Sequence, residues 1–344
     1  MGSLSSDAKL PWIKTPCLHN PQLSRVAGCN VYLKLENLQP SGSFKSRGIG
    51  NLMTQAAAAA SGPVHFYCSS GGNAGLACAT SALSLGQRAT IVIPTIITDL
   101  IKGKLLDLGV EVHQVGKNWA AADKYLRQEL LAGDPMGVYV PPFDDPRVWD
   151  GAATMMDEIR EQIEEPIEAI VCSVGGGGLV NGLMQGIEAH PWLGTKPAVL
   201  AVETEGADSL NASVRANEHV TLPEMTSIAT SLGATRVSEQ TWKWSQHPSG
   251  IMKSLVVSDA DAAVSCVRFA DDGRQLVEVA CGAALAIAYR GDLRKILGKD
   301  LSDEEWSEKN VVFVLCGGSN ITLDTRHHDH AGVNRLFSQC TSDE

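Results

Sequence analysis

The sequence lacks the features of a membrane, nucleic-acid-binding or disulfide-linked protein. No apolar run in its 344 residues approaches the length of a membrane span. Its 28 basic and 39 acidic residues give a net charge of −11 at pH 7, which argues against nucleic acid or an anionic membrane as a partner. Nine cysteines, an odd number with no CxxC pair, indicate reduced thiols rather than a disulfide framework.

Two common nucleotide-binding patterns are also missing. The chain has no G-x-G-x-x-G followed at the expected distance by an acidic residue, and no G-x-x-x-x-G-K-[ST]. Its first forty residues show neither the apolar stretch of a secretory signal nor the arginines of a transit peptide. We therefore expect a cytoplasmic protein that does not bind a nucleotide through either motif.

Strand-like and helix-like segments alternate along most of the chain. The candidate strands are residues 31–36, 64–68, 89–94, 110–115, 137–141, 169–174, 198–202 and 311–315. The candidate helices are residues 48–60, 74–85, 101–108, 119–131, 151–163 and 179–188. This regular alternation predicts an α/β fold with mostly parallel, doubly wound sheets. The proline-rich segment 141–146 is the clearest break and predicts a domain boundary.

One lysine, Lys45, lies in a run of small residues, Ser-Gly-Ser-Phe-Lys-Ser-Arg-Gly, at 41–48. A lysine that forms an imine with an aldehyde must lose its charge in a confined site that leaves room for a cofactor. A turn followed by a helix, with Ser43 as the cap and Lys45 solvated, explains this segment by itself equally well.

Two glycine loops favour the imine-forming interpretation of Lys45 over the solvated one. Residues 69–75 (SSGGNAG) and 173–179 (SVGGGGL) each follow an apolar run and are typical of a strand–loop–helix unit. Backbone N–H groups and a helix N-terminus in such a unit can bind a phosphate or a carboxylate. Four consecutive glycines weaken both strand and helix, and are tolerated where the backbone must pass close to another group. A cofactor monophosphate and a substrate carboxylate are the expected anions.

These three motifs, in this order, resemble the fold-type II pyridoxal-phosphate enzymes, whose fold is tryptophan synthase β-like. The resemblance covers nearly the whole chain and includes a fourth segment, VVFVLCGGSN, at 311–320. Within this fold type the motifs are most similar to the eukaryotic L-serine/L-threonine dehydratases. The resemblance implies two doubly wound domains with the cofactor in the cleft between them: a large discontinuous domain of residues 1–39 and 144–344, and a small domain of residues 40–143.

The resemblance also implies roles for individual residues. Lys45 is expected to hold the cofactor aldehyde and then to abstract the substrate α-proton. The expected cofactor-binding residues are Lys45, Phe44, Asn73, Gly175, Gly176, Gly177, Gly178, Cys316 and Gly317. The substrate carboxylate is expected at Ser69, Ser70, Gly71, Gly72 and Asn73. Phe44 serves equally well as an ordinary core aromatic.

Cys316 is the most diagnostic of these residues. A thiol facing the pyridine nitrogen is a weak partner that leaves this nitrogen largely neutral, which suits β-elimination better than transamination. The alternative is a buried structural cysteine at a strand end.

No histidine occurs in the motifs, so the resemblance implies that the cofactor phosphate protonates the leaving hydroxyl. Racemases of this fold type carry a second base near Gly71. If Gly71 faces the cofactor, racemisation should be poor.

Metal binding is a weaker expectation. The resemblance implies a monovalent cation, K⁺, at Glu203, Ala207 and Ser209, because carboxylate and carbonyl oxygens are hard ligands. His327 to His330 include three histidines and an aspartate, but this segment follows the last core strand, and a solvated tail is the simpler interpretation.

The sequence therefore predicts a pyridoxal 5′-phosphate-dependent ammonia-lyase. It would convert L-serine, L-threonine or both into a 2-oxo acid, pyruvate or 2-oxobutanoate, and ammonia, and the family resemblance implies a homodimer. Three alternatives stay open: another fold-type II reaction such as β-replacement or elimination on a specialised β-substituted amino acid, a weakly active dehydratase-like protein, and a non-catalytic binding protein.

Overall fold

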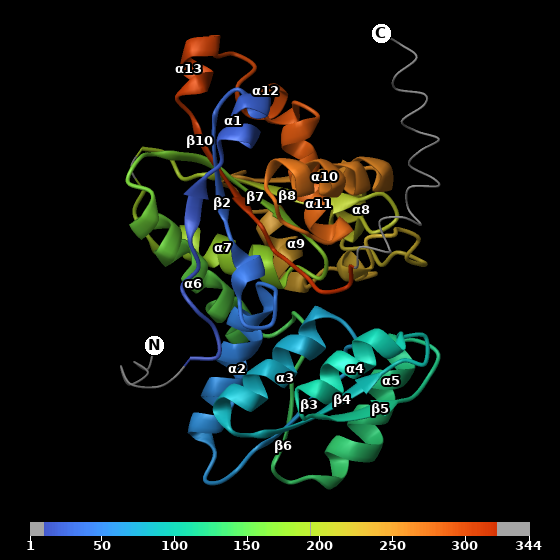
Figure 1. Ribbon diagram of the computed structural model, residues 1–344. Coiled ribbons are helices and arrows are strands. Elements are labelled where there is room, and N and C mark those ends of the chain that lie inside the picture. Colours follow the sequence, from blue (N-terminus) through green and yellow to red (C-terminus); the bar gives the residue numbers. More distant parts are fainter. Residues whose placement is uncertain (1–9, 193, 322–344) are drawn as a thin grey trace.

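The computed structural model describes residues 10–192 and 194–321, which form two α/β units, one below the other in Figure 1. The six-stranded sheet has the order β1-β2-β10-β7-β8-β9, and the four-stranded sheet the order β5-β4-β3-β6. The strands of the first are β1 (Cys17–His19), β2 (Asn30–Lys34), β7 (Ile167–Ser173), β8 (Ala198–Thr204), β9 (Met252–Val257) and β10 (Asn310–Val314). Those of the second are β3 (His65–Cys68), β4 (Arg88–Ile93), β5 (Glu111–Gln114) and β6 (Gly137–Tyr139).

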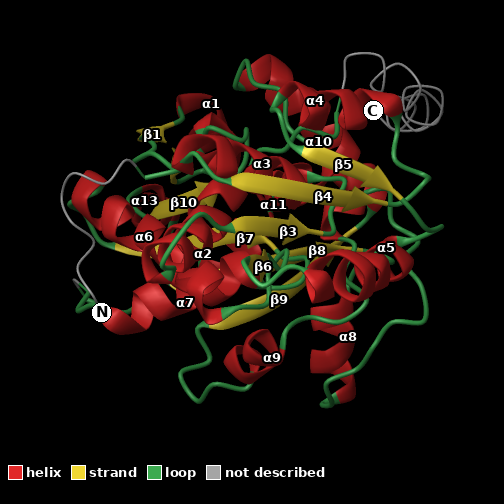
Figure 2. Ribbon diagram, turned by 90° about the horizontal axis from the view of Figure 1, so that it is seen from below, coloured by secondary structure: helices red, strands yellow, loops and turns green. Residues whose placement is uncertain are grey.

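Helices flank the strands of both sheets (Figure 2). Those of the small unit are α2 (Lys45–Ala59), α3 (Asn73–Leu85), α4 (Asp99–Asp107) and α5 (Trp119–Tyr125). Those of the large unit are α1 (Pro21–Ala27), α6 (Pro146–Gln162), α7 (Gly178–Ala189), α8 (Ser209–Ala216), α9 (Glu239–Ser245), α10 (Asp259–Asp272), α11 (Val279–Tyr289), α12 (Asp292–Leu297) and α13 (Asp303–Ser307).

The direction of the crossovers explains why both sheets are doubly wound. In the large sheet the chain moves from β7 through α7 to β8, and later returns from β9 through α10 and α11 to β10. Right-handed crossovers that run in opposite directions place their helices on opposite faces of the sheet. Every strand pair is parallel except β1–β2. The predicted α/β class and the predominantly parallel sheets are confirmed.

Most expected elements occur within a few residues of their predicted bounds. The helix predicted at 151–163 begins five residues earlier, at Pro146. The helix predicted at 48–60 begins three residues earlier, at Lys45. The helix predicted at 119–131 is regular only to Tyr125 and continues as a π-helical turn, Leu126–Leu130. Strands β1 and β9 were not among the expected strands, because β1 has only three residues and those of β9, Met-Lys-Ser-Leu-Val-Val, do not form a continuous apolar run.

The four strands of the small sheet lie between residues 65 and 139, inside the domain predicted at 40–143. The chain reaches this unit through α2 and leaves it through the proline-rich segment before α6. The exact domain boundaries stay a prediction, and His327 to His330 lie outside the described residues. Within the described residues, no helix is both long and apolar enough to cross a membrane.

Candidate active site

The predicted motifs follow the strands at which each sheet reverses its winding. In the large sheet this point lies between β7 and β10, and the loops that follow these strands carry Gly175 and Cys316. In the small sheet it lies between β3 and β6; the loop after β3 leads to Asn73, the first residue of α3, and the segment after β6 carries Phe143. Ligands of open α/β sheets bind at the carboxyl ends of the strands at such points. Both sheets therefore direct their motif loops to one candidate site.

Backbone contacts join the lysine segment to the cysteine segment. The Phe44 N–H donates to the Cys316 carbonyl at 3.1 Å, and the Gly318 N–H donates to the Gly42 carbonyl at 2.9 Å. A β-bridge pairs Ser43 with Gly317 between these two bonds. Segments more than 270 positions apart in the sequence thus lie side by side, and Lys45 begins α2 directly beside the loop that follows β10.

Lys45 has an amine suited to chemistry near neutral pH. The residue is only half-buried, but its amine is enclosed by protein, and this burial lowers the pKa of the amine to about 8, while Cys68 and Cys316 oppose the shift. The Nζ atom donates to the Pro142 carbonyl at 2.6 Å and lies 5.3 Å from the centre of the Phe44 ring. Phe44 itself packs against the core of the large unit, so its contact with a cofactor stays a prediction.

The tetraglycine loop has the form of an anion cradle. It leads into α7, and no side chain caps the N-terminus of this helix within the described part of the chain. Gly177 has a φ of +98°, and a Cβ atom there would lie 1.8 Å from the Thr241 hydroxyl oxygen. A Cβ atom at Gly176 would lie 2.4 Å from the Phe143 ring. Uncapped N–H groups and positions that tolerate only glycine fit a cofactor phosphate, which Gly175, Gly176, Gly177 and Gly178 would hold.

The amide of Asn73 lies between the two units. Its Oδ1 accepts a hydrogen bond from the Ser319 N–H at 3.0 Å, and its Nδ2 donates to both carboxylate oxygens of Glu278 at 3.1 Å. Glu278 is buried, with 4% of its surface exposed, and the sequence analysis did not single it out. One charged residue directly before the apolar helix Val279–Tyr289 was the only available hint. The predicted contact of Asn73 with a ring oxygen stays a prediction.

The loop predicted to bind the substrate carboxylate has contacts of its own. The Ser69 hydroxyl is fully buried and donates to Asp123 at 2.6 Å, whereas the Ser70 hydroxyl accepts from the Gly72 N–H at 3.3 Å. A Cβ atom at Gly71 would lie 2.6 Å from the Ile97 side chain. Ile97 thus occupies the space that a side chain at position 71 needs. The substrate-binding roles of this loop are not tested by these contacts.

Cys316 is a buried thiol, as its predicted role requires. A hydrogen bond with the Cys281 thiol and burial together raise the pKa of Cys316 well above its usual value, so the group stays neutral. Cys68, Cys172, Cys281 and Cys316 are all buried and form no disulfide. This agrees with the expectation of reduced thiols.

The predicted cation site contains one buried polar atom that lacks a hydrogen-bond partner among the described residues. The Ser209 hydroxyl oxygen is buried and has no hydrogen-bond partner among the described residues. Glu203 is fully buried, accepts from the Leu210 and Asn211 N–H groups at 2.8 Å, and burial raises its pKa to about 8. No cluster of three or more His, Cys, Asp or Glu side chains suited to a metal occurs in residues 10–192 or 194–321. The K⁺ site at Glu203, Ala207 and Ser209 stays a prediction.

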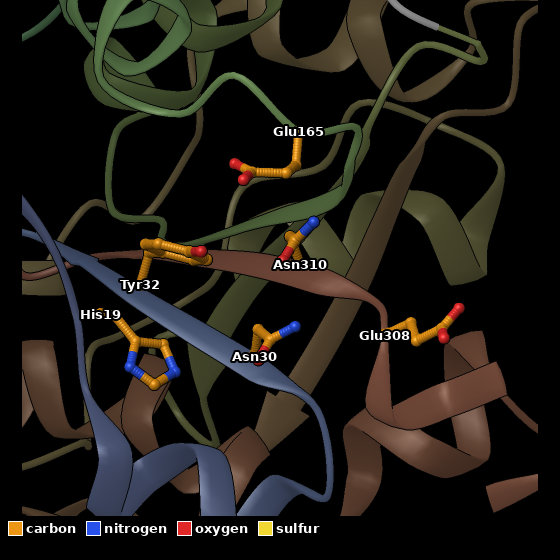
Figure 3. A pocket seen from close by; sticks show the side chains of 6 residues that line it. All are labelled: His19, Asn30, Tyr32, Glu165, Glu308 and Asn310. Atoms are coloured by element: carbon orange, nitrogen blue, oxygen red, sulfur yellow. The ribbon is translucent and has the colours of Figure 1, made fainter. Parts of the chain in front are cut away.

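A separate hollow of about 400 Å³ lies at the amino ends of two neighbouring strands of the large sheet, and Figure 3 labels its lining side chains. Its lining residues are His19, Asn30, Tyr32, Glu165, Glu308 and Asn310. Asn30 and Asn310 begin strands β2 and β10, so the hollow is at the amino ends of the strands. Because Cys316 follows the carboxyl end of β10, the hollow is distant from the residues of the candidate active site.

Comparisons with known proteins agree with this arrangement. A family model described as "Pyridoxal-phosphate dependent enzyme" matches residues 9–317. A Bos taurus protein named "L-serine dehydratase/L-threonine deaminase" is 43% identical over 312 residues, covering 90% of this chain and 92% of the relative. A Rattus norvegicus protein named "Serine dehydratase-like" is 43% identical over 310 residues, covering 90% and 91%. The crystal structure of a fungal L-serine ammonia-lyase from Rhizomucor miehei superposes with a TM-score of 0.85 at 38% identity, covering 93% of this chain and 98% of that one.

Proposed function

Because this chain belongs to the pyridoxal-phosphate-dependent enzymes of fold type II, we propose that it is an ammonia-lyase acting on L-serine, L-threonine or both. The reaction is β-elimination, which removes the α-proton and the β-hydroxyl and releases a 2-oxo acid and ammonia. The names of its relatives support this substrate class.

One observation carries the proposal. The Lys45 amine, with its pKa lowered to about 8, begins a helix at the junction of both switch points, beside a neutral thiol at Cys316. A lysine whose pKa lies near the working pH can act both as a nucleophile toward an aldehyde and as a base toward a C–H bond.

The cofactor, when bound, supplies the electron sink that makes the substrate α-proton acidic. The chain's own residues do the rest. The N–H groups of the tetraglycine loop would hold the phosphate, and the neutral Lys45 amine would accept the α-proton. The neutral Cys316 thiol would be a weak partner for the pyridine nitrogen and would leave it largely neutral, which suits β-elimination. Phe143 lies against the glycine loop at Gly176 and Gly178.

The test is an assay of 2-oxo acid and ammonia from L-serine, L-threonine and a panel of β-substituted amino acids, with and without a thiol acceptor. We expect equal amounts of 2-oxo acid and ammonia from serine or threonine, and no thioether product. Lys45→Ala should lose this activity and the visible absorption band of the bound cofactor. A thioether formed in place of 2-oxo acid would identify β-replacement instead, and no turnover with any substrate would contradict the proposal.

We also propose that K⁺ binds at Glu203, Ala207 and Ser209. The buried Ser209 hydroxyl, which has no hydrogen-bond partner among the described residues, and the buried Glu203 carboxyl support this site. K⁺ should raise the thermal midpoint of the protein relative to an equal concentration of tetramethylammonium, and Ser209→Ala should reduce this difference. An equal midpoint in both salts would contradict the assignment.

We further propose that the protein is cytoplasmic and forms a homodimer. The buried cysteines, none of which forms a disulfide in the described residues, support a reducing compartment, and the family resemblance supports the dimer. Light scattering after gel filtration measures the mass of the particle in solution, and a monomer mass would contradict the dimer. Expression of a full-length fluorescent fusion tests the compartment.

A further inference from the structure

Glu278 is a buried carboxylate for which neither the sequence motifs nor the proposed chemistry has a role. It directly precedes α11, and its backbone carbonyl accepts the N–H groups of Cys281 and Gly282. Its side chain extends to the loop that follows Cys316. Burial of a charged group costs free energy unless hydrogen bonds replace those to water, so the partners of this carboxylate must offset that cost.

All the partners of the Glu278 carboxylate in the described residues are neutral donors from three separate segments. Oε1 accepts the Asn320 N–H at 2.6 Å, and Oε2 accepts the Ser231 hydroxyl at 2.5 Å. Both oxygens accept from the Asn73 amide at 3.1 Å. Asn73 belongs to the small unit, whereas Ser231 and Asn320 belong to the large one. The carboxylate therefore links the two units at the candidate site.

These contacts determine which way the Asn73 amide points. The carboxylate accepts only, so the NH₂ end of the amide must face Glu278, and the Ser319 N–H must meet its oxygen. Without the carboxylate, the two orientations of the amide differ much less in energy. A fixed amide is needed if one of its N–H groups is to meet a ring oxygen of the cofactor, as predicted for Asn73.

The same carboxylate explains the second glycine after Cys316. A Cβ atom at Gly318 would lie 2.1 Å from the Glu278 Cδ and within 2.4 Å of both carboxylate oxygens. Gly318 also has a φ of +122°, which a side chain would strain. The loop after β10 is thus shaped around Glu278 as well as around the lysine segment.

We propose that Glu278 is a positioning residue for the cofactor site: it orients the Asn73 amide and holds the loop of Gly317 to Asn320 against the small unit. This inference rests on the proposed cofactor dependence but not on the identity of the substrate.

The experiment compares Glu278→Gln with the wild-type protein by two measurements that do not need turnover. In the cofactor-free protein, hydrogen exchange of the Ser319 and Asn320 amides should become about tenfold faster, because glutamine has one acceptor oxygen for donors that use two. Titration with pyridoxal phosphate should show affinity weaker by about tenfold. Asp272→Asn, which removes a carboxylate that accepts from Tyr289 away from the site, should change neither measurement.

A double variant separates positioning from general loosening. In an Asn73→Ala background, Glu278→Gln should weaken cofactor affinity by less than about threefold, because its effect passes through the missing amide. The full tenfold loss in that background, or unchanged exchange and affinity in the single variant, would overturn the proposal. If Glu278→Gln does not fold, Ser231→Ala should show the same two changes at smaller size, and no change there would overturn it. Weaker cofactor binding in a protein without ammonia-lyase activity would support the role of Glu278 while contradicting the proposed substrate.

Discussion

At the scale of single residues, the site combines groups that a stable protein would ordinarily avoid. Lys45 has its amine enclosed by protein without an ion-pair partner among the described residues, and Glu278 is a buried carboxylate held by neutral donors. Both arrangements cost folding free energy, because burial disfavours a charge. Such costs are tolerated where the group has a chemical task.

Lys45→Met should therefore stabilise the cofactor-free protein at pH 7. The unfolded amine titrates near 10.5 and the folded one at about 8, so the unfolded state binds more protons between these values. The stability of the wild type should rise with pH across this interval, and below pH 8 it carries the full penalty. We expect Lys45→Met to gain about 1 to 3 kcal/mol at pH 7 and little at pH 10.5.

Urea unfolding of the cofactor-free protein at pH 7 and pH 10.5 measures this difference. The exposed Lys299 provides a matched control, and Lys299→Met should have no effect at either pH. A gain of equal size at both values would show that methionine stabilises by packing rather than by removal of a buried charge.

At the scale of elements, the glycines of the strand–loop–helix units allow close backbone packing and leave N–H groups open to an anion. The loop between β7 and α7 passes so close to Phe143 and Thr241 that a side chain at Gly176 or Gly177 would collide with them. The same lack of side chains leaves the first N–H groups of α7 open to an anion. The effect of replacing a glycine in such a loop therefore depends on the atoms that surround it, whereas a glycine in open space has no neighbour with which a side chain would collide.

Gly177→Ala and Gly103→Ala should therefore have opposite effects. Gly177 has a positive φ and a Cβ position 1.8 Å from the Thr241 hydroxyl, so alanine should destabilise the protein by about 2 kcal/mol or more and weaken cofactor binding. Gly103 lies within α4 with no atom near its Cβ position, so alanine there should stabilise by about 0.5 to 1 kcal/mol. Thermal unfolding measures both. A loss of stability in Gly103→Ala, or none in Gly177→Ala, would contradict the expectation.

At the scale of the whole molecule, a buried ionic cluster joins α2 to the large unit. Arg47 lies two residues after Lys45 and donates to both oxygens of Glu36 at 2.8 Å and to both oxygens of Glu158 at 2.7 Å. The Lys34 amine also donates to Glu158, at 2.6 Å. These side chains are buried or nearly so, which makes the cluster a rigid anchor for the helix that carries Lys45.

Arg47→Met should destabilise the protein by about 3 to 5 kcal/mol, because it leaves buried carboxylates without their partner. Lys243→Met is the matched control, since its ion pair with Glu239 is exposed and should contribute less than about 1 kcal/mol. Chemical unfolding measures both changes. The double variant Arg47→Met, Glu36→Met should recover part of the loss, and a loss below about 1 kcal/mol in the single variant would show that water replaces the arginine.

The sequence by itself determined the parts of this protein that depend on local chemistry. Glycine runs after buried strands indicate anion loops because only glycine allows that backbone, and alternating apolar segments indicate parallel sheets because each strand must be buried on both faces. The tetraglycine loop could be chosen on these grounds, whereas Lys45, Asn73 and Cys316 received their roles from the family resemblance.

Only the tertiary structure decided which residues meet. Asn73 and Glu278 are 205 positions apart, and Lys45 and Pro142 are 97 apart. Local sequence patterns do not reveal such pairs. The loops come together because of the order of the strands in each sheet, and that order is a property of the tertiary structure. Glu278 stayed unrecognised for this reason: a single acidic residue before an apolar helix acquires its role only when two sheets, at their switch points, place three donors around it.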